Sequence, residues 1–324
     1  MDEETSNLTS QHVQNFSKIN HTNFSQFILL GFQDLHVLRI PIFMLLTITY
    51  FATIVGNLLI IAVVPTSRQL CLPMYRFLSH LSICDILIST NIVPNTLQVI
   101  LLGGSPLSFS GCLTQLYFFG ASAIIECCLL SVMSYDRYLA ICKPLHYSAV
   151  MNYRVSHYLV VWSWLVGFLQ SMVTHSLILQ LQFCGPNVID HFFCDLPPLL
   201  ALSCSDTSAV EIAVSIVSIV VGILQLVFIM VTYICISASV LQISSSTGRQ
   251  KAFSTCSSHL TVVGTYYGTL ITLYLAPSRG YSFNFNKVLS LLNTVVTPLF
   301  NPIIYTLRNR DIKSSIGKLV FMKK

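Results

Sequence analysis

Charged residues are scarce in this chain. Only 9% of its 324 residues are Asp, Glu, Lys or Arg, whereas about a quarter are charged in a typical soluble globular domain. Hydrophobic side chains make up 54% of the sequence. A chain with this balance lacks the polar side chains that a water-facing surface needs. The composition therefore excludes an ordinary soluble domain and predicts a protein surrounded by lipid.

Catalytic and metal-binding patterns are missing as well. The sequence has no Gly-rich phosphate loop, no Ser-His-Asp arrangement in a structural context, and no Cys-x-x-Cys or His-x-x-x-His spacing. Single histidines occur at His80, His157, His175 and His259, and we interpret them as hydrogen-bonded packing residues rather than ligands. These absences predict that the protein is not an enzyme.

Seven apolar stretches are long enough to cross a bilayer, because a helix needs roughly 20 residues to span the hydrocarbon core. The pattern is not the alternation of a membrane barrel, so we predict helices, whose backbone groups bond internally. The predicted spans are residues 40–64, 74–102, 112–142, 155–181, 210–243, 253–275 and 287–307. The predicted fold class is an all-α membrane protein, a seven-transmembrane helix bundle. It occupies residues 40–307, between an extracellular leader (1–39) and a cytoplasmic amphipathic tail (308–324).

Lysine and arginine are distributed unevenly between the two sides of this bundle. The stretches after the first, third, fifth and seventh spans carry most of them, including Arg137, Lys143, Arg154, Arg249 and Lys251. Short loops rich in these residues stay in the cytoplasm, so a multi-pass plasma-membrane protein with its amino terminus outside is predicted. The net charge of +5 needs no nucleic-acid partner, because anionic membrane lipid attracts the basic side.

The leader agrees with this orientation. Glycosylation sequons begin at Asn7, Asn15, Asn20 and Asn23. Such sites matter only on the luminal side of a membrane. Four of them within residues 7–25 predict a glycosylated extracellular leader.

Four cysteines fall on the predicted outer side, where thiols oxidise: Cys112, Cys184, Cys194 and Cys204. An even number there predicts two disulfides, and the spacing does not choose among the three pairings that four cysteines allow. Three of the four lie in the longest loop, residues 182–209, and a loop of that length usually has a function.

Four long segments, in order, resemble the signature segments of vertebrate olfactory receptors. They are LCLPMYRFLSHLSICD (70–85), MSYDRYLAICKPLHY (133–147), KAFSTCSSHLTVV (251–263) and TPLFNPIIYTLRN (297–309). An Asp-Arg-Tyr at the inner end of a third span, with Cys112 opening that span, is similar to the rhodopsin-like class of G-protein-coupled receptors. The resemblance covers nearly the whole chain. It also implies the disulfides Cys112 to Cys194 and Cys184 to Cys204.

The resemblance implies a role for the charged pair Asp136 and Arg137. At 1.5 Å per residue, Asp136 lies ~36 Å from Cys112, at the inner membrane boundary. Arg137 can pair there with Asp136 in a closed bundle and face a stimulatory olfactory G protein in an open one. Without the resemblance, Arg137 can equally be interpreted as a positive-inside anchor. The other residues to which the resemblance assigns coupling or switching are Tyr138, Tyr233, Lys251, Asn301, Pro302 and Tyr305.

Asp85 and Glu126 are the only acidic residues deep in the predicted bilayer, and the helix rise places them at one level. Two carboxylates at one depth cannot both ionise cheaply, so either one holds a proton or a cation lies between them. The resemblance favours a sodium ion that stabilises the closed bundle. The alternative is a protonated, hydrogen-bonded pair without metal, and no other cofactor is predicted.

The predicted ligand site is apolar with a few hydroxyl groups. Amine receptors carry an acid where this chain has Phe119, so a charged amine would find no partner. Such a lining suits a small hydrophobic odorant held by area and shape. For each position, ordinary helix packing is the alternative. The inward positions that the resemblance implies are Phe119, Gly120, Ala123, Ile124, Val217, Val221, Tyr267, Leu270, Ile271, Tyr274, Leu291 and Thr294.

An olfactory receptor is the predicted function, and two alternatives remain. One is a non-olfactory chemosensory receptor of the same class. The other is a transporter or channel, and the lack of an inverted repeat relating two halves of the chain counts against it.

Overall fold

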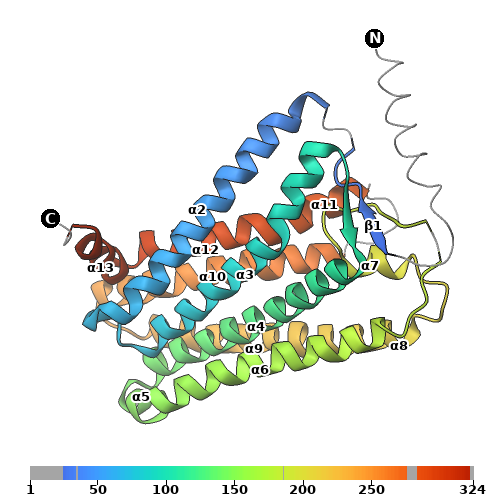
Figure 1. Ribbon diagram of the computed structural model, residues 1–324. Coiled ribbons are helices and arrows are strands. Elements are labelled where there is room, and N and C mark those ends of the chain that lie inside the picture. The colour runs from blue at the N-terminus through green and yellow to red at the C-terminus, as the bar shows by residue number, and fades with distance from the viewer. Residues whose placement is uncertain (1–24, 34–35, 185, 276–282, 322–324) are drawn as a thin grey trace.

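The computed structural model describes residues 25–33, 36–184, 186–275 and 283–321 (Figure 1). In these residues, seven long helical segments form a bundle with a small β-sheet at one end. The predicted glycosylation sites Asn7, Asn15, Asn20 and Asn23 lie outside the described residues.

Each predicted span falls on one long helical segment. The segments are α2 (Arg39–Thr66), α3 (Pro73–Leu102), α4 (Phe109–Cys142), α6 (Tyr153–Ile178), α8 with η3 and α9 (Ser208–Val217, Ser218–Ile223, Leu224–Leu241), α10 (Ser246–Leu275), and α11 with η4 and α12 (Phe283–Leu291, Leu292–Val296, Thr297–Arg308). The observed ends lie close to the predicted ones except at α10, which begins at Ser246 rather than at residue 253. Both η3 and η4 are short π-helical turns, which the sequence did not predict.

Five of the described helices are long and apolar enough to cross a membrane on composition alone: α2, α3, α4, the α8–α9 segment and residues 285–306. Hydroxyl side chains are frequent in the other two, α6 and α10. Many of these hydroxyls are satisfied within their own helix: Ser163 Oγ donates to the Leu159 carbonyl at 2.8 Å, and Thr265 Oγ1 donates to the Thr261 carbonyl at 2.7 Å. Internal hydrogen bonds of this kind lower the cost of placing polar groups in lipid.

Helix α4 is the central element of the bundle, because it packs against α3, α6, α9 and α10. Its inward side chains Ile125, Leu129 and Met133 are completely buried. Helix α2 packs on α3 and α12. The helix that carries the Asp136-Arg137 pair is therefore in contact with most of the bundle.

Three remote segments form the sheet, in the order β2–β1–β3. Strand β1 (Gln26–Leu29) pairs antiparallel with β2 (Ser105–Ser108) and parallel with β3 (Val188–Ile189). Gly103 (φ 75°) ends α3 in the left-handed region that favours glycine and turns the chain into β2. Ser108 then caps α4 by accepting a hydrogen bond from the Gly111 amide at 3.0 Å.

The opposite end of the bundle carries α13 (Arg310–Phe321), as Figure 1 shows. In this helix Ile312 and Ser315 are buried, whereas Asp311, Lys313 and Lys318 are exposed. The predicted amphipathic tail is thus a helix with one face on the bundle. The short helices α5 (Pro144–Val150) and α7 (Leu196–Leu200) and the turns η1 (His36–Leu38) and η2 (Arg68–Leu70) complete the described elements.

Two disulfides lie near the sheet. They join Cys112 to Cys194 and Cys184 to Cys204, which is the pairing that the resemblance implied. The first ties the long loop to the start of α4, and the second closes that loop on itself.

Candidate functional site

Asp136 and Arg137 lie near the end of α4 that is remote from the sheet, and each is only 3% exposed. Tyr147 of α5 donates a hydrogen bond from Oη to Asp136 Oδ1 at 2.9 Å. Burial, followed by the charge of Asp136, raises the pKa of Tyr147, so this phenol stays protonated and donates. The Arg137 guanidinium lies against α3, with Nη2 3.7 Å from Met74 Sδ. In this conformation the guanidinium is inside the bundle rather than on its surface.

A histidine bridge crosses three helices next to Arg137. His259 of α10 is completely buried. Its Nδ1 lies 2.8 Å from Tyr233 Oη of α9, and its Nε2 lies 3.1 Å from the Leu130 carbonyl of α4. Complete burial favours the neutral imidazole, and because a carbonyl only accepts, Nε2 carries its single proton and Nδ1 accepts from the phenol. A neutral imidazole therefore holds α10 against both neighbours.

Pro302 breaks the hydrogen bonding of α12 and leaves the Pro298 carbonyl without its helical partner. Asn57 of α2 replaces that partner, since its Nδ2 donates to the Pro298 carbonyl at 3.1 Å. Gly56 allows the approach: a Cβ there would lie only 3.2 Å from the Pro302 ring. The carbonyl that Pro302 frees is thus satisfied from a neighbouring helix rather than from its own.

The remaining predicted switch residues lie in different surroundings. Tyr305 is buried and its Oη has no hydrogen-bond partner among the described atoms. Tyr138 stacks on Tyr135 with ring centroids 6.2 Å apart, on a half-buried face of α4. The side chain of Lys251 lies outside the described residues.

Asp85 and Glu126 come together inside the bundle, 0% and 3% exposed, and a hydrogen bond joins their side chains, as the metal-free alternative requires. Asn301 Nδ2 donates to both oxygens of Asp85, at 3.0 and 3.2 Å. Oε1 of Glu126 and Oγ of Ser89, one turn after Asp85, have no hydrogen-bond partner among the described atoms. This set of buried oxygens suits a hard cation such as sodium. In the described part of the chain there is no group of three His, Cys, Asp or Glu side chains that could hold a metal ion.

Most of the predicted ligand positions lie in the bundle interior. Ile124, Val217, Val221, Tyr267 and Leu270 belong to one large apolar cluster, to which they contribute from α4, from α8 and η3 of the fifth segment, and from α10. The Tyr267 phenol, apart from the weak sulfur acceptor of Cys127, has no hydrogen-bond partner among the described atoms. These five positions are apolar apart from the Tyr267 phenol, a composition that suits contact with a small hydrophobic molecule.

Four further positions surround that cluster. The Ala123 carbonyl accepts a hydrogen bond from Tyr266 Oη at 2.9 Å, which links α4 to α10. Phe119 and Leu291 lie nearer the sheet, in a second apolar cluster. Thr294 is buried, and its hydroxyl donates to the Ser290 carbonyl of its own helical segment at 2.8 Å.

Two predicted positions do not face this interior. A Cβ at Gly120 would lie 3.2 Å from Ser171 Oγ, so Gly120 faces α6. Ile271 is 42% exposed, because it lies toward the outward side of α10. The side chain of Tyr274 lies outside the described residues. Two surface hollows, of 350 and 430 Å³, lie on other faces of the bundle, and neither includes a predicted ligand position.

The long loop closes the sheet end of the interior with an aromatic plug, residues 191–193. Phe192 and Phe193 are buried in the cluster that contains Phe119 and Leu291. The Phe193 ring lies edge-on to Phe119, with centroids 5.2 Å apart. The length of this loop predicted a function, but nothing in the sequence identified the plug. The sequence likewise predicted His259 only as a hydrogen-bonded packing residue.

Comparison with known proteins gives a consistent result. A family model described as "Olfactory receptor" matches residues 46–324. Human olfactory receptor 11A1 is 45% identical over 299 residues, covering 92% of this chain and 95% of its own length. Mouse olfactory receptor 5P56 is 46% identical over 301 residues, covering 93% and 97%. Human olfactory receptor 11L1 is 44% identical over 304 residues, covering 94% of each chain.

Proposed function

This chain belongs to the olfactory receptor family, and from that premise we propose that it binds a small hydrophobic odorant within the bundle and activates a stimulatory heterotrimeric G protein. As a family member it is a multi-pass membrane receptor and not an enzyme. One observation carries the proposal. A single helix, α4, joins the apolar interior to a buried guanidinium at the end of the bundle remote from the sheet.

We propose that the sheet lies outside the cell and α13 inside. Both disulfides lie at the sheet end, as an oxidising exterior favours. The exposed Lys313 and Lys318 of α13 lie where anionic inner-leaflet lipid would attract them.

Activation follows from contacts that only the closed bundle makes. A ligand that contacts Tyr267 lies beside the neighbouring residue, Tyr266. The Tyr266 phenol links α10 to the Ala123 carbonyl of α4. Outward motion of α10 also breaks the bond from His259 to the Leu130 carbonyl and opens the space around Arg137. A ligand can drive this motion only by binding the open bundle more tightly than the closed one.

The proposal is tested with a cyclic-AMP reporter in cells that supply the stimulatory olfactory G protein, screened against a chemically diverse odorant panel. A reproducible response that needs both odorant and G protein supports it. The rival from another class is a transporter or channel, and a substrate-dependent current or flux without any G protein would establish that rival instead.

Replacing His259 with Phe is expected to raise basal signalling. The ring keeps its packing volume but loses both bridging hydrogen bonds, each worth about 1 kcal/mol. The closed bundle should lose roughly tenfold or more in population relative to the open one. The measurement is agonist-free cyclic AMP at matched surface expression. Thr261→Val is the control, because Thr261 is exposed on the same helix and bonds only its own turn. If His259→Phe leaves basal signalling unchanged, the histidine bridge has no role in switching.

We also propose that a sodium ion binds beside Asp85 and Glu126. When bound, it supplies the positive charge that lets both carboxyl groups ionise. The purified receptor is then expected to unfold at a higher temperature in sodium chloride than in N-methylglucamine chloride of equal ionic strength. Glu126→Gln should remove that difference. A wild-type unfolding temperature that is equal in both salts would instead favour a protonated pair without metal.

A further inference from the structure

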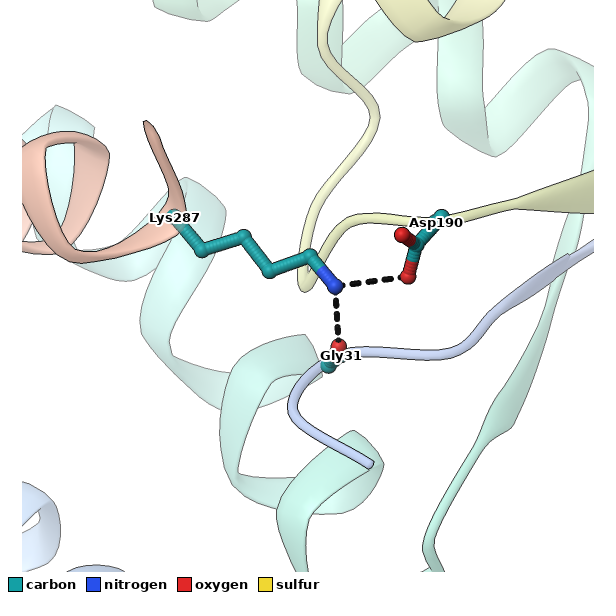
Figure 2. A network of polar contacts seen from close by, with 3 residues as sticks. All are labelled: Gly31, Asp190 and Lys287. Carbon is teal, nitrogen blue, oxygen red and sulfur yellow. Dashed lines mark hydrogen bonds and ion pairs between the residues drawn. The ribbon is translucent and has the colours of Figure 1, made fainter. Parts of the chain in front are cut away.

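Lys287 is a charged side chain buried at the sheet end of the bundle. It lies on α11 and is only 2% exposed. Figure 2 shows its Nζ between two oxygens: Asp190 Oδ1 at 2.6 Å and the Gly31 carbonyl at 2.8 Å. A buried ammonium group is costly unless it is paired and hydrogen-bonded, so these two contacts fix the side chain. One lysine thus joins the seventh helical segment to the leader and to the long loop.

The two partners of Lys287 belong to one hydrogen-bonded unit. The Gly31 amide donates to the His191 carbonyl at 3.1 Å, and the Leu30 amide donates to the Ile189 carbonyl at 3.0 Å. We call this unit the lid; it comprises residues 26–31, 105–108 and 187–194, which include the whole sheet. Because its segments are bonded to one another, they are expected to move together.

The lid is held at two sides by different means. On the α4 side, the Cys112–Cys194 disulfide is covalent, and the Cys194 amide also donates to Gln115 Oε1 at 2.8 Å. On the α11 side, the ion pair with Lys287 includes Asp190, whose side chain is 44% exposed. Water can reach the exposed carboxylate and compete for it. The lid can therefore open on the α11 side while it stays attached to α4.

The lid carries the aromatic plug into the bundle. The His191 ring packs against both Phe192 and Phe193. Its centroid lies 4.6 Å from the centroid of each phenylalanine ring. Burial, followed by the charge of Lys287, lowers the pKa of His191 to about 3, so its ring is neutral at physiological pH. Leu291, one turn after Lys287, packs in the same cluster as Phe119. The plug therefore forms the outer wall of the ligand site.

We propose that Lys287 is a positioning residue for ligand binding: by pairing with Asp190 it latches the lid, and so controls which odorants reach the interior and how quickly. This inference rests on the proposed function, because it assumes a ligand inside the bundle. The latch restricts the site to molecules that fit beneath Phe192 and Phe193. Its release lets the plug withdraw and admits longer molecules.

Hydrogen exchange of the full-length receptor tests the latch without any ligand. Lys287→Met and Asp190→Asn are expected to speed amide exchange in residues 26–31 and 187–193 by about fivefold or more, the scale of a partly exposed ion pair. The exchanged pair, Lys287→Asp with Asp190→Lys, should recover much of the protection. Lys313→Met, an exposed lysine on α13, is the matched control and should leave the lid unchanged. Equal exchange in the wild type and all four variants would overturn the latch.

A homologous series of aliphatic alcohols and aldehydes, applied in the reporter assay, tests the effect on ligands. Both single variants should respond to longer members that the wild type rejects, at matched surface expression, and the exchanged pair should again resemble the wild type. If lid exchange is faster but the same ligand chain lengths activate the variants and the wild type, Lys287 has only a structural role and the proposal is wrong. If no member activates any of the proteins, that failure counts against the proposed function, while hydrogen exchange still decides whether the latch exists.

Discussion

Replacing Arg137 with Ala is expected to abolish odorant-dependent signalling while the receptor still reaches the cell surface. Arg137 is 3% exposed, with Met74 of α3 and Tyr233 of α9 as neighbours, and it lies beside the histidine bridge that the proposed outward motion of α10 would break. Only in the open bundle can this planar, permanently charged group bond to carbonyl or carboxyl groups of a G protein. Alanine offers none of these bonds, so cyclic AMP should fall to the level of cells without receptor.

The control for this experiment is Arg154→Ala. Arg154 is exposed at the start of α6, at the same end of the bundle, and carries the same charge. Both variants lose one positive charge at this end of the bundle, but only Arg137 should affect signalling. If the two variants signal equally, Arg137 is an anchor for membrane orientation and no more, which is the alternative that its sequence position left open.

The seven helices could be predicted from the sequence because a bilayer imposes a minimum apolar length that shows directly in the residues. The early start of α10 marks the limit of that reasoning. Residues 246–252 are polar and belong to the helix, yet they need not lie in lipid. A search for apolar length finds the part of a helix inside the membrane and misses a polar extension.

Contacts between remote segments could not be predicted in the same way. Strands β1, β2 and β3 have four residues or fewer, too short for an alternating pattern to stand out. The roles of His259 and Lys287 depend on partners far along the chain, and nothing in their neighbouring residues signals those partners. The ligand positions implied by the resemblance stay predictions, and two of them, Gly120 and Ile271, face away from the interior. A family resemblance does not show how each helix is rotated about its own axis in this chain.

The Cys112–Cys194 disulfide is expected to be the more important of the two for folding. It closes a loop of 82 residues, whereas Cys184–Cys204 closes one of 20. Loop-closure entropy in the unfolded chain then corresponds to about 4.5 kcal/mol for the first and about 3 kcal/mol for the second. The difference in function should be larger, because only the first attaches the lid to α4. Cys112→Ser should therefore leave residues 187–194 of the lid with the Lys287 latch but without their disulfide to α4.

Surface labelling and ligand-free thermal unfolding of Cys112→Ser and Cys184→Ser distinguish these effects. We expect Cys112→Ser to lose most of its surface expression, and any protein recovered to unfold at a clearly lower temperature than Cys184→Ser. Its lid should also exchange faster than that of Lys287→Met, because a covalent tether holds more strongly than a partly exposed ion pair. If Cys184→Ser proves the more damaging change, the long loop itself, rather than its attachment to α4, is what the sheet end needs to fold. The lid would then be anchored chiefly by its hydrogen bonds and by Lys287.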